Sequence, residues 1–327
     1  MARHRNFCLP LLAFSTISIL AGCNSGPSVS GTFDRNYDVS GPIRLELTNA
    51  SGDVDITGSA DGKVHVHGDV RASGFGSGSS QKRLDDTLAH PPIEQRGDTI
   101  RIGKEMSRIR NVSIAYTIQV PRDTEVSSSL ASGAQTIRGV RGPVKAQAAS
   151  GTIRVEKIER DTQLSTASGS ISATDIGNDV RVTSASGTVT VSNTRGDVHV
   201  NAVSGVIRVS NPGGRIEADT ASGEVEIQGA ASDVKAHALS GRVSVQGNPG
   251  ADSYWELKTM SGSVQLGVPA SANLHLSAEA VSGEIRTDVP IVIEEQGKHS
   301  LRAHMGSGGG RVDVHTVSGE IRLTGTN

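Results

Sequence analysis

Aromatic residues, cysteines and net charge are all scarce in this chain. Phe, Trp and Tyr together make up 2% of its 327 residues, there are two cysteines, and the formal net charge is -2. Hydrophobic residues amount to 35%, which is thin for a globular core but suits stacked strands with small side chains. The near-neutral charge gives no basis for nucleic-acid binding, which needs a clustered basic face.

The N-terminus has the organisation of a secretory signal peptide. A basic start at residues 3–5 precedes an apolar run, residues 7–20, that is too short to span a bilayer. The sequence Leu-Ala-Gly-Cys that ends at Cys23 resembles the bacterial lipobox. This resemblance implies lipidation of Cys23 and anchoring in the cell envelope, and Asn24 after it, in place of Asp, favours the outer membrane. Cys8 leaves with the signal, so we expect neither a disulfide nor a thiolate metal site.

A Ser-Gly pair returns every eighteen residues through the middle of the chain. The serines that begin these pairs are Ser132, Ser150, Ser168, Ser186, Ser204, Ser222 and Ser240. The pair then returns at Ser261, Ser282 and Ser318, and we expect these to continue the same series in order. A fixed period of this size is typical of a solenoid, in which each repeat buries its apolar face against its neighbours.

Each period contains two segments of alternating apolar residues. Val189 and Val191 represent the first segment, after the Ser-Gly pair, and Val198 and Val200 the second, after a turn near Gly196. Alternation of β-branched residues predicts strands, and glycine suits corners because it adopts positive φ. The sequence thus predicts an all-β, single-domain parallel β-solenoid with two sheets, eighteen residues per coil and a right-handed crossover. Sheets about 10 Å apart should exclude aromatic side chains from the interior.

The rest of the chain is assigned around this solenoid. We expect a lipoprotein signal peptide over residues 1–22, a flexible tether over 23–40, an irregular β section that caps the stack over 41–130, and the regular repeats over 131–327. Within the cap, residues 74–80 are rich in Gly and Ser and predict a flexible break, and residues 81–90 have one weakly amphipathic face.

The segment from Val112 to Gly133, followed by repeated Ala-Ser-Gly-x-Val-x-Val units, resembles the DUF4097 family of candidate adhesins of the bacterial envelope. The resemblance runs from about Pro42 to the C-terminus. It implies a parallel β-solenoid with a surface role, and it brings no catalytic residues with it.

Outward positions of successive coils should form rows about 4.8 Å apart. Two such rows bring together a candidate surface cluster of His199, Glu217, Asp219 and His237, in which Asp219 is placed to orient His237 for general-base chemistry. The alternative is a solvated sheet face with alternating charges, which we favour because the sequence shows no nucleophile or oxyanion donor.

Two further features carry weaker alternatives. Asp161, Asp179, Asp197 and Asp233 follow the turns, as in calcium-binding β-rolls, but one carboxylate per coil supplies too few oxygen ligands. The single Trp, Trp255, is either a sugar-stacking platform or, as we prefer, a cover over the sheet where the regular coil is interrupted.

These observations favour a non-enzymatic envelope lipoprotein whose rigid surface binds a partner in the manner of an adhesin. The partners expected are the membrane, through the lipid anchor, and an envelope polysaccharide or a surface protein. We expect no cofactor, no metal and no nucleic acid. A polysaccharide-active β-solenoid enzyme is the alternative, and a calcium-binding β-roll is a weaker one. The scarcity of aromatic residues argues against the enzyme, because sugar clefts generally use rings for stacking.

Overall fold

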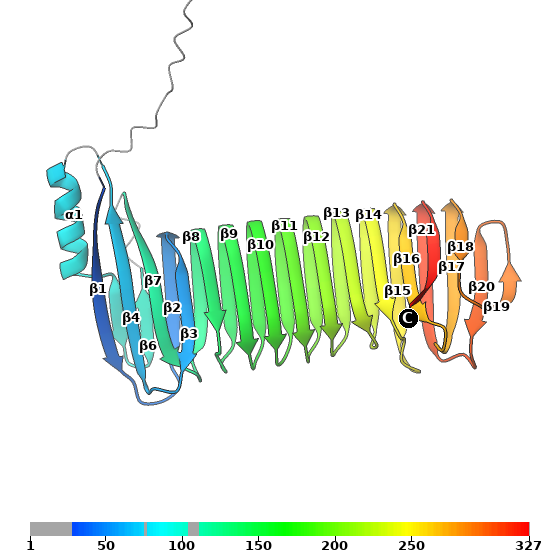
Figure 1. Ribbon diagram of the computed structural model, residues 1–327, viewed down its shortest axis with the longest axis horizontal. Coiled ribbons are helices and arrows are strands. Elements are labelled where there is room, and N and C mark those ends of the chain that lie inside the picture. The colour runs from blue at the N-terminus through cyan, green and yellow to red at the C-terminus, as the bar shows by residue number, and fades with distance from the viewer. Residues whose placement is uncertain (1–27, 75–76, 104–110, 327) are drawn as a thin grey trace, which may run out of the picture.

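The protein is a long stack of β-coils (Figure 1). The computed structural model describes residues 28–74, 77–103 and 111–326. The expected signal peptide and Cys23 lie outside these residues. Among the described residues, no helix is both long and apolar enough to cross a membrane.

The regular middle of the stack consists of one long strand per coil. Each strand pairs in parallel with the next along the chain, and the residues that pair are eighteen apart, for example Val182 with Val200 and Val200 with Ala218. The strands are β8 (Glu125–Arg138), β9 (Val144–Ile158), β10 (Thr162–Ile176), β11 (Val180–Thr194), β12 (Val198–Pro212), β13 (Ile216–Ala230) and β14 (Val234–Gly247). The predicted solenoid and its period are therefore confirmed, and the two predicted segments are two arms of one bent strand.

The inward and outward faces follow the predicted alternation. Val198 and Val200 are fully buried, whereas Asn201 is exposed and the His199 side chain is 26% exposed. Burial of one such valine contributes about 1.5–3 kcal/mol, which a stack of similar coils repeats many times.

Glycine is required at the corner where each long strand bends. Gly187 has φ of 126°, which residues with a Cβ rarely adopt. A Cβ atom at Gly187 would lie 1.8 Å from the carbonyl oxygen of Gly169 in the preceding coil. The Ser-Gly period thus reflects a column of glycines in backbone contact with one another.

The N-terminal end is a cap of shorter strands and one helix. Helix α1 (Ser77–Ala89) packs against β1 and β4 beside the end of the stack (Figure 1). The strands are β1 (Val29–Asp38), β2 (Arg44–Ser51), β3 (Val54–Ser59), β4 (Lys63–Ala72), β5 (Ile93–Arg96), β6 (Thr99–Ile102) and β7 (Val112–Pro121). Strand β2 pairs directly with β8, so that Ser51 stacks on Ser132.

Two predictions for this end are wrong. Residues 29–38 were expected in a flexible tether, but they form β1, which pairs with β4 in antiparallel fashion and buries Phe33. The helix begins at Ser77, within the expected flexible break, because its apolar side chain Leu84 is buried in the core of the cap. Strand β1 pairs along β4, and α1 packs against both strands.

The C-terminal end departs from the order of the sequence. Strand β21 pairs with β15 on one side and with β17 on the other, so the Ser318 coil lies between those of Ser261 and Ser282. Figure 1 shows β21 in red within this end of the stack. The strands are β15 (Tyr254–Ser261), β16 (Val264–Pro269), β17 (Leu274–Ser282), β18 (Ile285–Thr287), β19 (Val292–Gln296), β20 (Ser300–Met305), β21 (Gly310–Ser318) and β22 (Ile321–Thr326). The expectation of a sequential series is wrong here.

Aromatic side chains enter the interior outside the regular coils. Trp255 is fully buried, at the position between Val234 and Val312 of the adjacent strands, and its Nε1 donates a 2.7 Å hydrogen bond to the Ser232 carbonyl. The prediction that Trp255 covers the sheet from outside is therefore wrong, as is the exclusion of aromatic side chains from the core. This coil is longer than the regular ones, because Trp255 pairs with Val234, 21 residues before it.

Candidate functional site

The predicted surface cluster forms two separate pairs on one sheet face. His199 Nδ1 lies 3.1 Å from Glu217 Oε2, and His237 Nδ1 lies 3.2 Å from Asp219 Oδ1. Each pair joins adjacent coils, because the parallel register places the two residues opposite each other. The expected contacts are present, but they cross-link the coils and do not bring all four side chains together.

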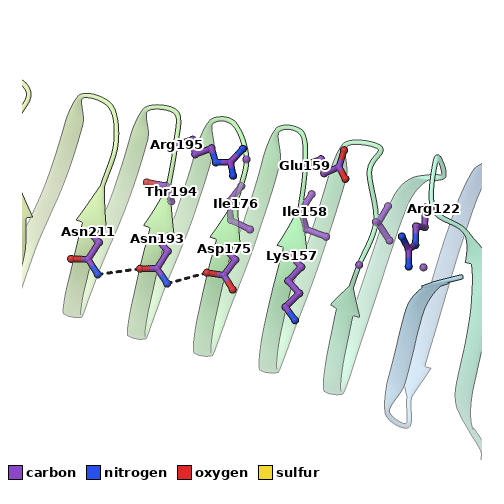
Figure 2. Close-up of a pocket in the computed structure, with 14 residues that line it drawn as sticks. Arg122, Lys157, Ile158, Glu159, Asp175, Ile176, Asn193, Thr194, Arg195 and Asn211 are labelled. Atoms are coloured by element: carbon purple, nitrogen blue, oxygen red, sulfur yellow. Dashed lines mark hydrogen bonds between the residues drawn. The ribbon is translucent and has the colours of Figure 1, made fainter. Parts of the chain in front are cut away.

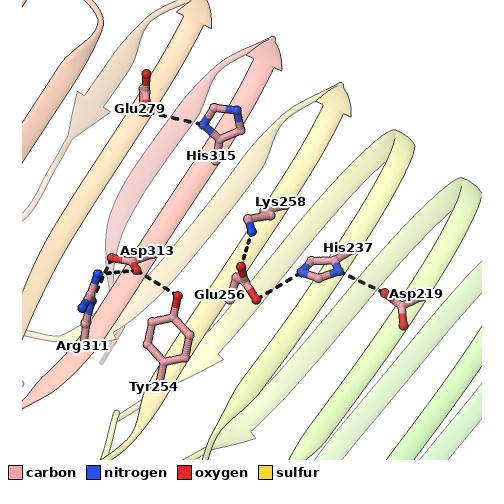
Figure 3. Close-up of polar contacts among 9 residues, drawn as sticks. All are labelled: Asp219, His237, Tyr254, Glu256, Lys258, Glu279, Arg311, Asp313 and His315. Atoms are coloured by element: carbon pink, nitrogen blue, oxygen red, sulfur yellow. Dashed lines mark hydrogen bonds and ion pairs between the residues drawn. The ribbon is translucent and has the colours of Figure 1, made fainter.

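The second pair continues along the sheet towards the C-terminal end (Figure 3). His237 Nε2 is 3.6 Å from Glu256 Oε2, and Glu256 also forms an ion pair with Lys258. The hydrogen bond to Asp219 raises the pKa of His237. The negative charges of Asp219 and Glu256 also raise it, whereas burial lowers it. The hydrogen bond from Lys258 lowers the pKa of Glu256. Acidic and basic side chains therefore alternate along this row.

The same face ends in a second polar group. Tyr254 donates a 2.9 Å hydrogen bond to Asp313, which also forms an ion pair of 2.9 Å with Arg311. The guanidinium carbon of Arg311 lies 5.6 Å from the centre of the Tyr254 ring. His315 and Glu279 form a further pair at 3.7 Å (Figure 3). Tyr254, and not Trp255, is therefore the residue on this face that presents an aromatic ring to solvent.

The row of aspartates after the turns binds backbone amides of the next coil. Asp179 accepts a hydrogen bond of 2.9 Å from the Asp197 amide, and Asp197 accepts one of 2.8 Å from the Arg215 amide. Asp233 accepts from the Tyr254 amide in the same way, at 2.9 Å. These carboxylates stabilise the turns by joining coil to coil. Over the residues that the structure describes, no three His, Cys, Asp or Glu side chains are grouped to hold a metal ion.

A groove of about 730 Å³, which we call the corner groove, runs along the turns on the side opposite the Ser-Gly corner (Figure 2). One wall is a row of residues with positive φ, which are joined where Asn211 donates to Asn193 at 3.1 Å and Asn193 donates to Asp175 at 2.9 Å. The lining residues are Gly58, Arg122, Gly139, Val140, Lys157, Ile158, Glu159, Asp175, Ile176, Gly177, Asn193, Thr194, Arg195 and Asn211.

The floor of the corner groove contains one polar side chain without a partner. Val140, Ile158 and Ile176 are buried floor residues, and Thr194 takes the equivalent position in the next coil. Thr194 is only 4% exposed, and its Oγ1 has no hydrogen-bond partner within the protein. An unpaired buried hydroxyl costs about 1–3 kcal/mol, and because this oxygen is itself buried it belongs to the packed floor and not to the surface that a ligand would contact.

Sequence reasoning missed the corner groove. The available signal was the position seven residues after four of the corner serines, which holds Lys157, Asp175, Asn193 and Asn211. The period alone does not require polar residues there, because an inward-facing residue or a glycine would also fit it. Asn and Asp adopt positive φ more readily than most residues. Their presence in register marks a second corner with its own row of polar side chains.

The chain belongs to the Toastrack DUF4097 family, whose model matches residues 43–249 and 215–324. Two solved structures are similar to it. A candidate cell adhesion protein from Clostridium sporogenes has 10% sequence identity and a TM-score of 0.23, with 91% of this chain and 100% of that one covered. A candidate adhesin from Bacteroides fragilis has 13% identity and a TM-score of 0.27, with 90% and 97% covered. No curated protein matches the chain.

Proposed function

We propose that this protein is a non-enzymatic lipoprotein of the bacterial envelope that binds an extended polar polymer along its solenoid, in the manner of an adhesin. The observation that carries the proposal is the corner groove. It offers amide, carboxylate, ammonium and guanidinium groups from successive coils, above an apolar floor. A long polymer with many hydroxyls, such as an envelope polysaccharide, matches a row of hydrogen-bonding groups that repeats at the strand spacing.

The anchor is part of the proposal. Cys23 would carry the lipid and hold the protein in the envelope, at the outer membrane by the identity of Asn24. Replacing Cys23 by Ser should release the protein from the membrane fraction. If this variant stays with the membrane after a high-salt wash, the lipobox interpretation is wrong.

Binding is tested with purified protein that carries Cys23→Ser and therefore lacks the proposed lipid. The protein is incubated with purified peptidoglycan and, separately, with lipopolysaccharide, and retention is measured by co-sedimentation and by biolayer interferometry. We expect binding to one of them, weakened about tenfold or more by Asn193→Gly, which removes an exposed amide from the wall of the groove and keeps the positive φ of this position. Arg208→Ala serves as the control, because Arg208 does not line the corner groove, and it should leave binding unchanged. Equal binding by all three proteins contradicts a role for the corner groove.

A polysaccharide-active enzyme is the competing function, and the Asp219–His237 pair is the observation in its favour. The same preparations therefore need to be assayed for released reducing ends. We expect none. Release that is abolished in a variant carrying Glu217→Ala and Asp219→Ala would replace the binding proposal with an enzymatic one.

A further inference from the structure

The loops in front of β15 and β21 border a second pocket, of about 470 Å³, which we call the Tyr254 pocket. Tyr254 and Arg311 pair in register near the start of these two strands (Figure 3). The lining residues are Ala251, Asp252, Ser253, Tyr254, Gly309 and Arg311. The pocket has no lining residue in common with the corner groove. What binds in it is therefore a question that goes beyond the proposed function.

Hydrogen bonds hold the walls of the Tyr254 pocket in place. The Ser253 hydroxyl donates a 2.8 Å hydrogen bond to the Gly250 carbonyl, within the loop before β15. The Gly250 amide donates one of 2.9 Å to the Ala231 carbonyl of the preceding coil, and the Arg311 amide joins β21 to this loop by donating to the Ser253 carbonyl at 2.9 Å. The pocket is thus formed before a ligand binds, which reduces the entropy cost of binding.

Tyr254 gives the pocket an aromatic wall. The residue is 36% exposed, and its hydroxyl donates the 2.9 Å hydrogen bond to Asp313. Arg311 lies beside the ring, so the ring is held in one orientation (Figure 3). Part of an aromatic ring is therefore presented to solvent among polar groups. Carbohydrate rings stack on such a surface, because their C–H faces are apolar while their edges carry hydroxyls.

The charges around the pocket leave one carboxylate free. Asp252 is exposed, and among the described residues its side chain has no hydrogen-bond or ion-pair partner. Arg311 is the only cationic residue in the lining, and its ion pair with Asp313 neutralises it. Asp233, in the neighbouring coil, is paired with Arg215 at 3.4 Å. The pocket therefore has a net negative charge, which disfavours uronic acids, phosphates and other anions.

We propose that the Tyr254 pocket binds one unit of a neutral carbohydrate, with a pyranose ring stacked on Tyr254 and ring hydroxyls donating to the Asp252 carboxylate. An ionised carboxylate accepts such hydrogen bonds more strongly than a neutral group does. A basic peptide is the other ligand that negative charge and an aromatic ring attract, but Arg311 already takes the position of a cation beside the ring, 5.6 Å from its centre. The volume of about 470 Å³ is within the range of small-ligand sites, about 300–1,000 Å³.

Trisaccharides test the proposal on the Cys23→Ser protein. The neutral probes are maltotriose, cellotriose and triacetylchitotriose, with trigalacturonic acid as the anionic counterpart and triarginine as the basic peptide. Calorimetry measures affinity, and saturation-transfer difference NMR with irradiation of the aromatic protons shows which sugar protons lie near a ring. We expect at least one neutral trisaccharide to bind about tenfold or more tighter than trigalacturonic acid, with saturation that reaches its ring C–H protons.

Variants of the same protein locate the site. Tyr254→Ala should weaken binding of the neutral trisaccharide about tenfold or more, Tyr254→Phe, which keeps the ring, less than about threefold, and Asp252→Ala about threefold or more. Asn193→Gly, in the corner groove, should leave this binding unchanged. The proposal is overturned if no neutral trisaccharide binds, if trigalacturonic acid or triarginine binds as tightly as the best of them, or if Tyr254→Ala has no effect. Because Asn193→Gly tests polymer binding in the corner groove separately, the proposed function and this inference fail by different results.

Discussion

The regular coils and the two ends of the stack follow different rules. Between Ser132 and Ser240, neighbours in sequence are neighbours in space, and each coil repeats the same core and the same corner. At the ends the chain departs from this order, so that β2 stacks on β8 and β21 inserts between β15 and β17. A repeat can define its own interior without defining how a stack begins or ends.

The ends have to solve a problem that the middle does not have, which is an open sheet edge. At the N-terminal end, β1 pairs along β4 in antiparallel fashion, and α1 packs against both strands. At the C-terminal end the last strand of one sheet is β19, which carries Glu294 and Glu295. Charges on an edge strand discourage further strand addition. The ends also hold the large buried aromatic residues Tyr116 and Trp255.

The largest difference between the two regions should appear when residues are deleted. Removal of residues 187–204, one period, should leave a folded and shorter protein, because the coil before and the coil after present the same surface. Removal of residues 187–195 should prevent folding, since it joins one arm of a coil to the wrong sheet. Circular dichroism and gel filtration of both variants provide the measurement. A folded nine-residue deletion, or an unfolded eighteen-residue one, would contradict the equivalence of the coils.

Trp255 probes the irregular end. Its replacement by Ala should lower the free energy of unfolding by about 3–5 kcal/mol, because a fully buried indole leaves a large cavity. Tyr254→Ala is the control on the adjacent exposed residue and should cost less than about 1 kcal/mol. Chemical denaturation followed by circular dichroism measures both. Similar losses for the two variants would mean that Trp255 is not in the core.

The glycine column distinguishes the regular corner from an ordinary turn. Gly187→Ala combines an unfavourable φ with a Cβ atom 1.8 Å from the Gly169 carbonyl oxygen, and it should cost about 1–3 kcal/mol or more. Gly97, between β5 and β6, also has positive φ, at 56°, but no atom lies within 4 Å of its Cβ position. Gly97→Ala should therefore cost less. Thermal melting of the two variants compares them, and a larger shift for Gly97→Ala would argue against contact along the column.

A small pH effect is expected on the outer face. The pKa of His237 is raised above its ordinary value of 6.5, mainly by its hydrogen bond to Asp219, so protonated His237 stabilises the fold. This contribution is fully present below about pH 6.5 and is lost as the pH rises through the folded-state pKa. The side chain is 37% exposed, so the contribution is at most about 0.2–1 kcal/mol. The stability difference between wild type and His237→Gln should shrink from pH 5.5 to pH 9, and a difference that grows over this range would contradict the assignment.

The sequence was sufficient for the middle of the molecule because each position there recurs in register. It predicted that Val200 faces inward and that Asp219 meets His237. It could not place β21, since a spacing of two periods from Ser282 to Ser318 is compatible with either stacking order. Trp255 was misplaced because it stands in a coil of 21 residues, to which the regular period does not apply. The corner groove was missed because it depends on which turn residues the folding brings side by side.

The register of the repeat is the central claim, and two neighbouring substitutions test it most directly. Val200→Asp buries an unpaired carboxylate between Val182 and Ala218 and should cost several kcal/mol. His199→Asp puts the same group on the outer face, between Arg181 and Glu217, and should cost less than about 1 kcal/mol. We predict a large fall in melting temperature for the first variant and a small one for the second. Equal falls would contradict the assignment, because a slip of one residue exchanges the two faces.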